Sequence, residues 1–259
     1  MKPRVVAIIQ ARMGSTRLPG KVLMKINSHS MLEEVIRRTK AIEGVDEVIV
    51  AATENLQDSA IVSLCKKLKT NFFRGSEDDV LDRYYQCAKA AMAVVVIRIT
   101  SDCPLLDPNI VEEGLKLFQT TNADYVSNAL KRTYPRGLDF EIFTFSALAR
   151  AWKEGKEQTD REHVTPYIYE NPQKFKILQL LSDKDCSNYR LTVDTEIDLE
   201  LVRRIFKALG KNRKIFGLAP IVKFLEKNPE LAKINSEVVQ KDKDLQEEAL
   251  RKIVNLRIH

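Results

Sequence analysis

The sequence predicts an α/β protein built on a mostly parallel sheet with helices on both faces. Short, apolar, β-branched segments alternate with longer segments of helical periodicity through the first half of the chain, as in successive β-α-β units. These short segments are mostly apolar, which is typical of strands buried on both faces. The 259 residues, 44% of them hydrophobic, are enough for one large core.

The first half of the chain contains three predicted strands, Val5–Ile9, Glu47–Ala52 and Val94–Thr100. Four predicted helices accompany them, over Met31–Ile42, Asp58–Leu68, Glu77–Ala91 and Pro108–Thr120. After Asp124 the alternation changes, and the predicted elements are a strand over Leu138–Phe143, helices over Thr144–Lys153 and Arg161–Glu170, and strands over Lys176–Leu181 and Tyr189–Val193. This second half predicts a mixed sheet with an antiparallel excursion.

Two regions follow from this pattern. Residues 1–211 form the predicted main domain, with the antiparallel excursion at about 132–190, and residues 212–259 form a predicted C-terminal helical appendage. From about Thr195 the chain is helical and rich in charge. Its last segment, Ser236–Leu256, has apolar residues at helical spacing, which predicts an amphipathic helix that lies on the main domain or on a partner subunit.

The composition indicates which classes of partner and which cellular location to expect. The net charge of +6 and pI near 9 suit a polyanion, but aromatic residues make up only 7% and do not interleave with basic ones, so we expect no nucleic acid partner. The four cysteines have no paired ligand spacing, which argues against a zinc site or a disulfide scaffold. No apolar segment reaches the roughly 20 residues of a membrane helix, and no signal peptide is recognisable. We expect a cytoplasmic protein.

The first candidate site is the segment "QARMGSTRLPGK", Gln10 to Lys21, which directly follows the first predicted strand. It lies in a stretch from Met1 to Leu32 that has six cations and no carboxylate. Five residues separate Gly14 from Gly20, whereas a Walker loop has four, and the glycine pattern of dinucleotide-binding loops is absent too. A loop with cations at positions 12, 17 and 21 can surround a triphosphate. The alternative is an ordinary basic surface loop.

Two carboxylates are candidates for the metal ion that accompanies a triphosphate. Asp102 follows the strand Val94–Thr100, and Asp194 follows the predicted strand Tyr189–Val193. Both are therefore expected at the edge of the sheet that carries the basic loop, and Mg²⁺ commonly takes one or two carboxylates together with phosphate oxygens. Asp107 and Asp198 are rivals, but each precedes a helical segment, where an acidic residue is an ordinary N-terminal helix charge.

Six blocks of the sequence carry a family resemblance: "IIQARMGSTRLPGKVL", "GSEDDVLDRY", "TSDCPLLD", "GLDFEIF", "REHVTPYI" and "RLTVDTEIDL". In this order and at these distances they resemble the spore coat polysaccharide biosynthesis protein F group. That group belongs with the cytidylyltransferases that activate acidic sugars, such as the acylneuraminate and 3-deoxy-manno-octulosonate cytidylyltransferases. The resemblance covers about Val5 to Leu201 and implies a Rossmann-like nucleotide-diphospho-sugar transferase fold.

The resemblance also implies roles for individual residues. Nucleotide-binding residues are expected at Gln10, Ala11, Arg12, Gly14, Ser15, Arg17, Lys21, Ser76, Arg83, Thr100 and Asp102. Within this set Arg12, Lys21 and Asp102 are the expected catalytic residues, the segment from Ser76 to Arg83 borders the cytosine, and Asp102 and Asp194 hold Mg²⁺. The octulosonate enzymes carry Gln-Gly-Asp where this chain has Thr100-Ser101-Asp102, so the choice of sugar cannot be copied from them.

The implied reaction is the attack of an acceptor hydroxyl on the α-phosphorus of CTP, with pyrophosphate leaving. Candidate acceptor-binding residues are Arg136, Asp139, Glu141, Arg161 and His163, since an acidic sugar requires cations and an arginine can bind its carboxylate as a planar fork. The alternative is that these groups tie the excursion to the sheet or to a second subunit. Related enzymes are usually dimers, and Tyr134–Phe143 is a candidate contact.

Other functions stay open from the sequence. A nucleotidyltransferase of the same fold with another nucleotide, or with a sugar phosphate, polyol phosphate or phosphonate as acceptor, would share these features. A glycosyltransferase usually needs two aspartates around the metal, whereas position 100 is Thr. A nucleotide-binding module without catalysis is the alternative outside enzymes.

Overall fold

A seven-stranded sheet forms the centre of the fold, in the order β5-β4-β1-β6-β8-β7-β9. The computed structural model describes residues 3–239 of the chain. The strands are β1 (Val5–Gln10), β4 (Glu47–Thr53), β5 (Asn71–Gly75), β6 (Val95–Thr100), β7 (Tyr125–Ser127), β8 (Glu141–Thr144) and β9 (Ile177–Gln179). Within residues 3–239, β8 is the one strand of this sheet that runs antiparallel to its neighbours. The predicted mostly parallel sheet with an antiparallel excursion is confirmed.

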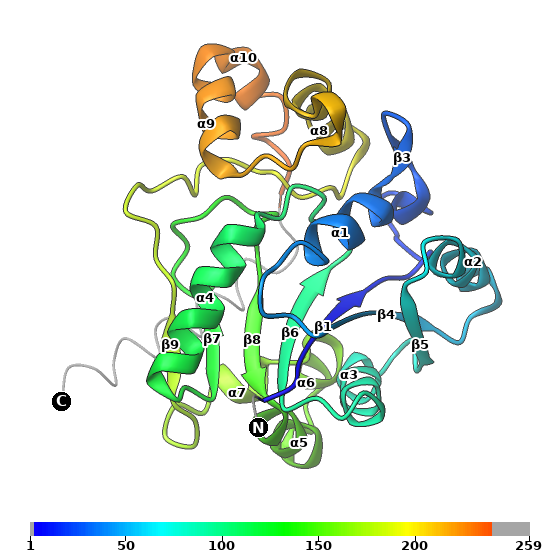
Figure 1. Ribbon diagram of the computed structural model, residues 1–259, viewed down its shortest axis with the longest axis vertical. Coiled ribbons are helices and arrows are strands. Elements are labelled where there is room, and N and C mark those ends of the chain that lie inside the picture. The colour runs from blue at the N-terminus through cyan, green and yellow to red at the C-terminus, as the bar shows by residue number, and fades with distance from the viewer. Residues whose placement is uncertain (1–2, 240–259) are drawn as a thin grey trace.

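Helices cover both faces of this sheet because its strands are apolar on both sides (Figure 1). The helices are α1 (Met31–Thr39), α2 (Ser59–Lys67), α3 (Val80–Ala90), α4 (Pro108–Thr121), α5 (Phe145–Glu154), α6 (Gln158–His163), α7 (Pro166–Tyr169), α8 (Glu196–Leu209), α9 (Leu218–Lys227) and α10 (Pro229–Ala232). Along β1, Val5, Ala7 and Ile9 join the buried cluster that includes α1, α2 and α4. Val6 and Ile8 join the cluster of α3 and α5 on the other face, so successive side chains of one strand enter two cores.

The predicted elements agree with the structure where the periodicity is long and depart from it at four places. β5 and β7 were not predicted. Tyr189–Val193, predicted as a strand, is not one, although Leu191 and Val193 are buried and Arg190 forms an isolated bridge with Arg136. The predicted helix Arg161–Glu170 is two short helices, because Val164 between them adopts φ +75°. Most of the predicted helix Ser236–Leu256 lies outside the described residues.

The order of the strands creates a crevice beside β1. The chain passes from β1 to β4 and β5 on one side, and then returns to β6 on the other side of β1. In an α/β sheet, ligands bind beyond the carboxyl ends of the strands at such a reversal. The loops that follow β1 and β6 are neighbours here, and the basic loop and Asp102 are parts of them. The topology therefore places both candidate segments at one site.

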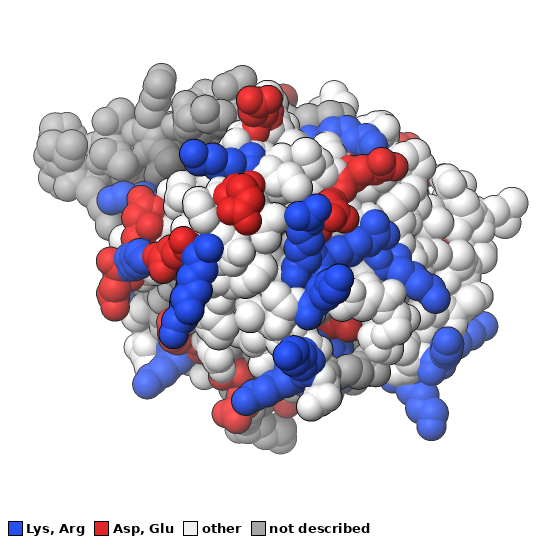
Figure 2. All heavy atoms as spheres, turned by 90° about the horizontal axis from the view of Figure 1, so that it is seen from above, with Lys and Arg blue, Asp and Glu red and all other residues white. Residues whose placement is uncertain are grey.

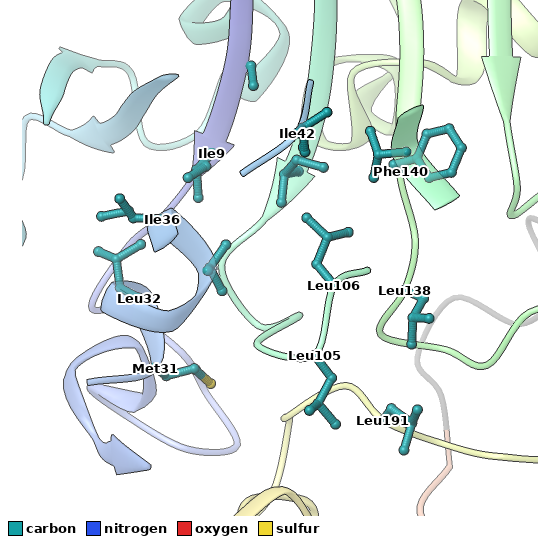
Figure 3. Close-up of a cluster of buried hydrophobic side chains, with 14 of the residues drawn as sticks. Ile9, Met31, Leu32, Ile36, Ile42, Leu105, Leu106, Leu138, Phe140 and Leu191 are labelled. Carbon is teal, nitrogen blue, oxygen red and sulfur yellow. The ribbon is translucent and has the colours of Figure 1, made fainter. Parts of the chain in front are cut away.

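Apolar side chains fix the loops at this edge of the sheet. Leu105 and Leu106, which follow β6, pack in the same buried cluster as Met31 and Leu32 of α1, and Leu191 of the segment before Asp194 joins them (Figure 3). All five side chains are at most 1% exposed. The loop after β6 and the segment before Asp194 are therefore packed into the core, which limits their motion.

Gly137 marks a tight crossing between the excursion and the segment that leads to Asp194. Its φ is +101°, and a Cβ atom there would lie 2.3 Å from the amide nitrogen of Thr192. We expect Gly137→Ala to lower the free energy of unfolding by at least about 1–3 kcal/mol. The positive φ is unfavourable for alanine, and its Cβ atom would clash with the backbone of Thr192. Urea unfolding would measure this. Gly20→Ala is the control: its φ is +70°, but its nearest contact is the flexible Met13 side chain at 3.4 Å.

The C-terminal helices α8, α9 and α10 lie beyond the carboxyl ends of the parallel strands (Figure 1). Arg38 of α1 ties them down: its Nη1 donates to the carbonyls of Leu106 at 3.0 Å and Phe216 at 2.9 Å, and its guanidinium lies over the ring of Phe216. Burial lowers the pKa of Arg38 to about 10. Ile221 and Leu225 of α9 belong to the same buried cluster as β1. The division of the chain at residue 211 stays a prediction.

No helix within residues 3–239 is both long enough and apolar enough to cross a membrane.

Candidate functional site

A cavity of about 550 Å³ opens at the crevice between β1 and β6. Its lining includes nine of the predicted site residues, namely Gln10, Arg12, Ser15, Arg17, Lys21, Thr100, Asp102, His163 and Asp194. Lys and Arg side chains gather on the face of the molecule at this end, next to a smaller number of acidic ones (Figure 2). The structure thus brings together residues from the first loop, from β6 and its loop, from α6 and from the segment before α8.

Lys21 is the centre of this cavity. Gly20, with φ 70°, turns the chain into a short 3₁₀ helix over Lys21–Leu23. The Nζ of Lys21 donates to Asp102 Oδ2 at 3.1 Å, to Asp194 Oδ1 at 3.0 Å and to the carbonyl of Val193 at 2.7 Å. Burial opposes the charge of Lys21, but the two carboxylates outweigh burial and raise its pKa. In turn, burial opposes the charge of Asp102, and its pair with Lys21 prevails and lowers its pKa.

The basic loop is fixed in place by backbone contacts and one buried carboxylate. Asp58 accepts a hydrogen bond from the amide of Met13 at 2.7 Å and another from the amide of Thr53 at 2.9 Å. It is 1% exposed, so it fixes the loop after β1 to the loop after β4. The amide of Gly20 donates to the carbonyl of Met13 at 3.0 Å, which closes the loop on itself. Asp58 was not among the predicted site residues, because its position before a helix gave no separate signal.

A chain of ion pairs runs from the loop into the core through Asp194. Arg17 Nη2 lies 2.8 Å and Arg190 Nη2 lies 2.6 Å from Asp194 Oδ2. Arg190 Nε then donates to Asp198 Oδ1 at 2.9 Å. Asp198 also forms a capping box with Thr195 at the start of α8, and Asp107 caps α4. The interpretation of Asp107 and Asp198 as N-terminal helix charges is confirmed, and Asp198 has a partner in Arg190 besides.

Arg83 and Ser76 do not line the cavity. Arg83 is fully buried and donates through Nη1 to the carbonyl of Ser76, while its Nε and Nη2 find no hydrogen-bond partner in the part of the chain that the structure describes. Burial lowers the pKa of this guanidinium. A buried cation with two donors to spare, beside the segment Ser76–Asp79, is compatible with the predicted border of the cytosine, and that role stays a prediction.

His163 is the predicted acceptor residue that lines the cavity. The others lie behind it or elsewhere. Glu141 pairs with Arg98 and accepts from the hydroxyl of Tyr125 at 2.6 Å. Arg161 pairs with Asp79 and donates to the carbonyl of Trp152 at 3.0 Å.

Asp139 pairs with Arg132, and the carbonyl of Arg136 accepts from the amide of Leu191 at 2.6 Å. For Asp139, Glu141 and Arg161 this geometry supports the structural alternative over direct contact with an acceptor.

Arg98, which was not among the predicted site residues, lines the cavity and lies between Gln10 and Glu141. A cation inside the apolar strand "VVVIRIT" was the available signal: a buried strand tolerates a charge when it is paired. Gln158 and Glu162 of α6 also line the cavity. The cavity lining therefore carries both charges, and the cations of the basic loop, Arg12, Arg17 and Lys21, lie beside the carboxylates of Glu77, Asp102 and Asp194.

Comparisons with known proteins identify the family of this chain. Residues 6–245 match the family model described as Cytidylyltransferase. An uncharacterized protein of Methanocaldococcus jannaschii is 43% identical over 92% of this chain and 97% of its own length. The spore coat polysaccharide biosynthesis protein SpsF of Bacillus subtilis is 30% identical over 88% of this chain and 96% of its own length.

One solved structure and one further relative are also similar to this chain. The structure of a cytidylyltransferase from Leptospira borgpetersenii serovar Hardjo-bovis superposes with a TM-score of 0.85 at 34% identity, over 89% of this chain and 97% of that one. The 3-deoxy-manno-octulosonate cytidylyltransferase of Pelobacter propionicus is 29% identical over 43% of this chain and 43% of its own length. The resemblance noted in the sequence is confirmed.

Proposed function

Because the chain belongs to the cytidylyltransferase family and is a CTP-dependent nucleotidyltransferase, we propose that it activates an acidic sugar with CTP for the synthesis of a surface polysaccharide. The products are a CMP-sugar and pyrophosphate. The observation that carries the proposal is the convergence of Lys21, Asp102 and Asp194 on one point of a cavity that has a cationic loop at one end and Arg98 and His163 at the other.

The reaction follows from the charges along the cavity. A hydroxyl oxygen of the acceptor forms a bond to the α-phosphorus of CTP and its proton passes to solvent, while the bond from that phosphorus to the bridging oxygen of pyrophosphate breaks. Negative charge grows on the α-phosphate and on the leaving pyrophosphate. Arg12, Arg17 and Lys21 line the cavity where these groups would lie, and fixed cations stabilise such charge without reorganisation. The loop also orients the triphosphate for attack.

The two aspartates fit a magnesium ion. One oxygen of Asp102 and one of Asp194 lie 3.1 and 3.0 Å from the same ammonium nitrogen, so both carboxylates face one cationic position. Within residues 3–239 no group of three or more acidic, His or Cys side chains converges on a metal position, which suits an ion that takes its other ligands from phosphate and water. Bound there, Mg²⁺ would neutralise phosphate charge. Lys21 would turn its ammonium group from the carboxylates to the phosphates.

Arg98 and His163 supply hydrogen-bond donors for an acidic acceptor at their end of the cavity, beside the carboxylate of Glu162. Arg98 is held in place by Glu141 and lies within 3.4 Å of Gln10 Oε1, and His163 faces the same space. A relative is named as a 3-deoxy-manno-octulosonate cytidylyltransferase, and its substrate is a sugar acid. SpsF is named for spore coat polysaccharide biosynthesis. These observations together support an acidic sugar destined for a surface polymer.

Release of pyrophosphate tests the proposal. The protein is mixed with CTP, Mg²⁺ and a panel of nonulosonic and octulosonic acids, with sugar phosphates, polyol phosphates and phosphonates as a second panel. We expect release with an acid of the first panel. Release confined to the second panel would contradict the acidic acceptor, and binding of CTP without release across both panels would contradict catalysis. Melting temperatures with CTP, UTP, GTP and ATP identify the base, since a ligand of the native state raises them.

His163→Ala should raise the KM for the acceptor about 10–100-fold and leave the KM for CTP unchanged, because a lost hydrogen bond to a charged ligand costs roughly 1.5–3 kcal/mol. Initial rates at varied acceptor and varied CTP separate the two constants. His29→Ala is the matched control: His29 pairs with Glu33 at the start of α1 and does not line the cavity. A larger effect on CTP than on the acceptor would contradict the assignment of this end.

A further inference from the structure

We propose that Asn235, in the C-terminal segment beyond α10, is a positioning residue for the metal-binding carboxylate Asp194. The inference rests on the proposed function of Asp194. Asn235 is 2% exposed and reaches Asp194 through two groups, Asp198 and Arg190. No predicted site residue lies beyond residue 194, so this role extends the catalytic machinery by about forty residues along the chain.

Arg190 connects Asp194 to Asp198. Its Nη2 donates to Asp194 Oδ2 at 2.6 Å and its Nε to Asp198 Oδ1 at 2.9 Å. A guanidinium is planar, so fixing one edge on Asp198 fixes the direction of the other edge. The orientation of the Asp194 carboxylate therefore depends on where Asp198 lies. The same carboxylate presents Oδ1 to Lys21 on the cavity side.

Asp198, which is 0% exposed, is held in place by hydrogen bonds to both of its carboxylate oxygens. Its Oδ2 accepts from the amides of Asp194 at 3.0 Å and Thr195 at 2.9 Å. Its Oδ1 accepts from Asn235 Nδ2 at 2.7 Å in addition to Arg190. These hydrogen bonds outweigh the cost of burial and lower the pKa of Asp198. Asn235 thus completes the shell around a fully buried charge.

The carboxamide of Asn235 holds both the side chain of Asp198 and the backbone of Arg190. Its Nδ2 also donates to the backbone carbonyl of Arg190, at 3.0 Å, so both of its hydrogens are used. It holds the side-chain partner of Arg190 and the backbone of Arg190 at the same time. An amide can do this without adding charge. An aspartate at this position would face Asp198 and a carbonyl oxygen with no hydrogen to offer, at a buried point.

The course of the chain agrees with this role. The helices α8 to α10 lie over the carboxyl edge of the sheet (Figure 1), and the segment after α10 returns toward the cavity. Four residues beyond Asn235, the carbonyl of Val239 accepts from Arg17 Nη1 at 3.3 Å. Arg17 is also a partner of Asp194. The same short segment thus contacts the site from the core side at Asn235 and from the loop side at Val239.

The test uses Asn235→Ala and Asn235→Asp in the full chain. Groups that directly contact a metal ligand typically contribute 10–100-fold to metal affinity or activity, and Asn235 acts through one such group, Arg190. We expect Asn235→Ala to weaken Mn²⁺ binding, measured by electron paramagnetic resonance with and without CTP, about tenfold, and to lower kcat by a similar factor with a smaller change in KM for the acceptor. Asn235→Asp should have the larger effect on both.

Asn228→Ala is the matched control. Asn228 begins α10, and its Nδ2 donates to the carbonyl of Phe224 at 2.8 Å, so its loss weakens the same region without touching the network. Rates are compared well below the lowest melting temperature. If Asn235→Ala does not fold, Asn235→Ser, which keeps one donor, replaces it.

An effect on Mn²⁺ binding and kcat that exceeds that of Asn228→Ala supports the inference, and equal effects overturn it. A wild-type protein that binds Mn²⁺ but releases no pyrophosphate would contradict the proposed function. Loss of affinity in Asn235→Ala would still support the positioning role in that case.

Discussion

Lys21→Ala should lower turnover with CTP and the correct acceptor by about 10²–10³-fold, the effect of removing one fixed donor from a preorganised electrostatic site. Lys21 is the one side chain whose ammonium group contacts both Asp102 and Asp194 within the described part of the chain. Its loss leaves two carboxylates facing each other across the cavity with less positive charge between them. Initial rates of pyrophosphate release at saturating CTP measure the effect.

Lys25→Ala serves as the control for Lys21→Ala. Lys25 follows in the same segment and is exposed, and its backbone carbonyl, which accepts from Arg203, is unaffected by the substitution. Turnover within about twofold of wild type is expected for it. Near-normal turnover in Lys21→Ala would exclude Lys21 from catalysis. Melting curves of both variants show whether a loss of rate reflects a loss of fold.

Asp198→Asn should lower the free energy of unfolding by about 1.5–3 kcal/mol, because Arg190 keeps Asp194 as an ion partner but loses its charged hydrogen bond to a buried carboxylate. Asp198 is 0% exposed and Arg190 9% exposed in their side chains. The asparagine would also direct hydrogens at the amides that Asp198 now accepts from. Urea unfolding at pH 7 gives the difference. A change below 1 kcal/mol would show that the network does not stabilise the fold.

Two comparisons sharpen this measurement. Glu200→Gln breaks an exposed pair on the same helix, Glu200 with Arg204, and should cost less than about 1 kcal/mol. The second comparison is pH. The pKa of Asp198 is lowered in the folded protein, so its contribution is complete above its unfolded pKa of about 4 and is lost as the pH falls. The difference between wild type and Asp198→Asn should therefore shrink below about pH 4.

The sequence was sufficient for the central part of the fold, because that part is fixed by local pattern. Continuously apolar strands such as Val5–Ile9 are distinctive, and so is a carboxylate-free loop with two glycines directly after one of them. Strand ends in a parallel sheet share one edge, so Asp102 could be placed beside that loop. Asp194 came to the same edge although Tyr189–Val193 is not a strand, because Leu191 and Val193 still pack into the core.

Features that depend on tertiary contacts could not be predicted from the sequence. β5 is an edge strand whose residues are half-buried or exposed, so it carries no apolar run, and β7 has three residues. The direction of the Arg161 side chain is set by Asp79, 82 residues away, and no local pattern encodes such a choice. Asn235 is the extreme case, since a single buried amide in a helical, charged region looks like any surface residue.

The hydrogen bond from Lys21 to Asp194 joins residues 173 positions apart, and this has a consequence for biosynthesis. A chain emerges from the ribosome at about 5–20 residues per second, so the first loop waits roughly ten seconds or more for the carboxylate that neutralises it, and longer for Asn235. Before Asp194 is synthesised, both neighbours of β1 in the sheet, β4 and β6, are already present, but the cavity is incomplete. The nascent protein can therefore form part of its sheet before it can bind a nucleotide in the complete site.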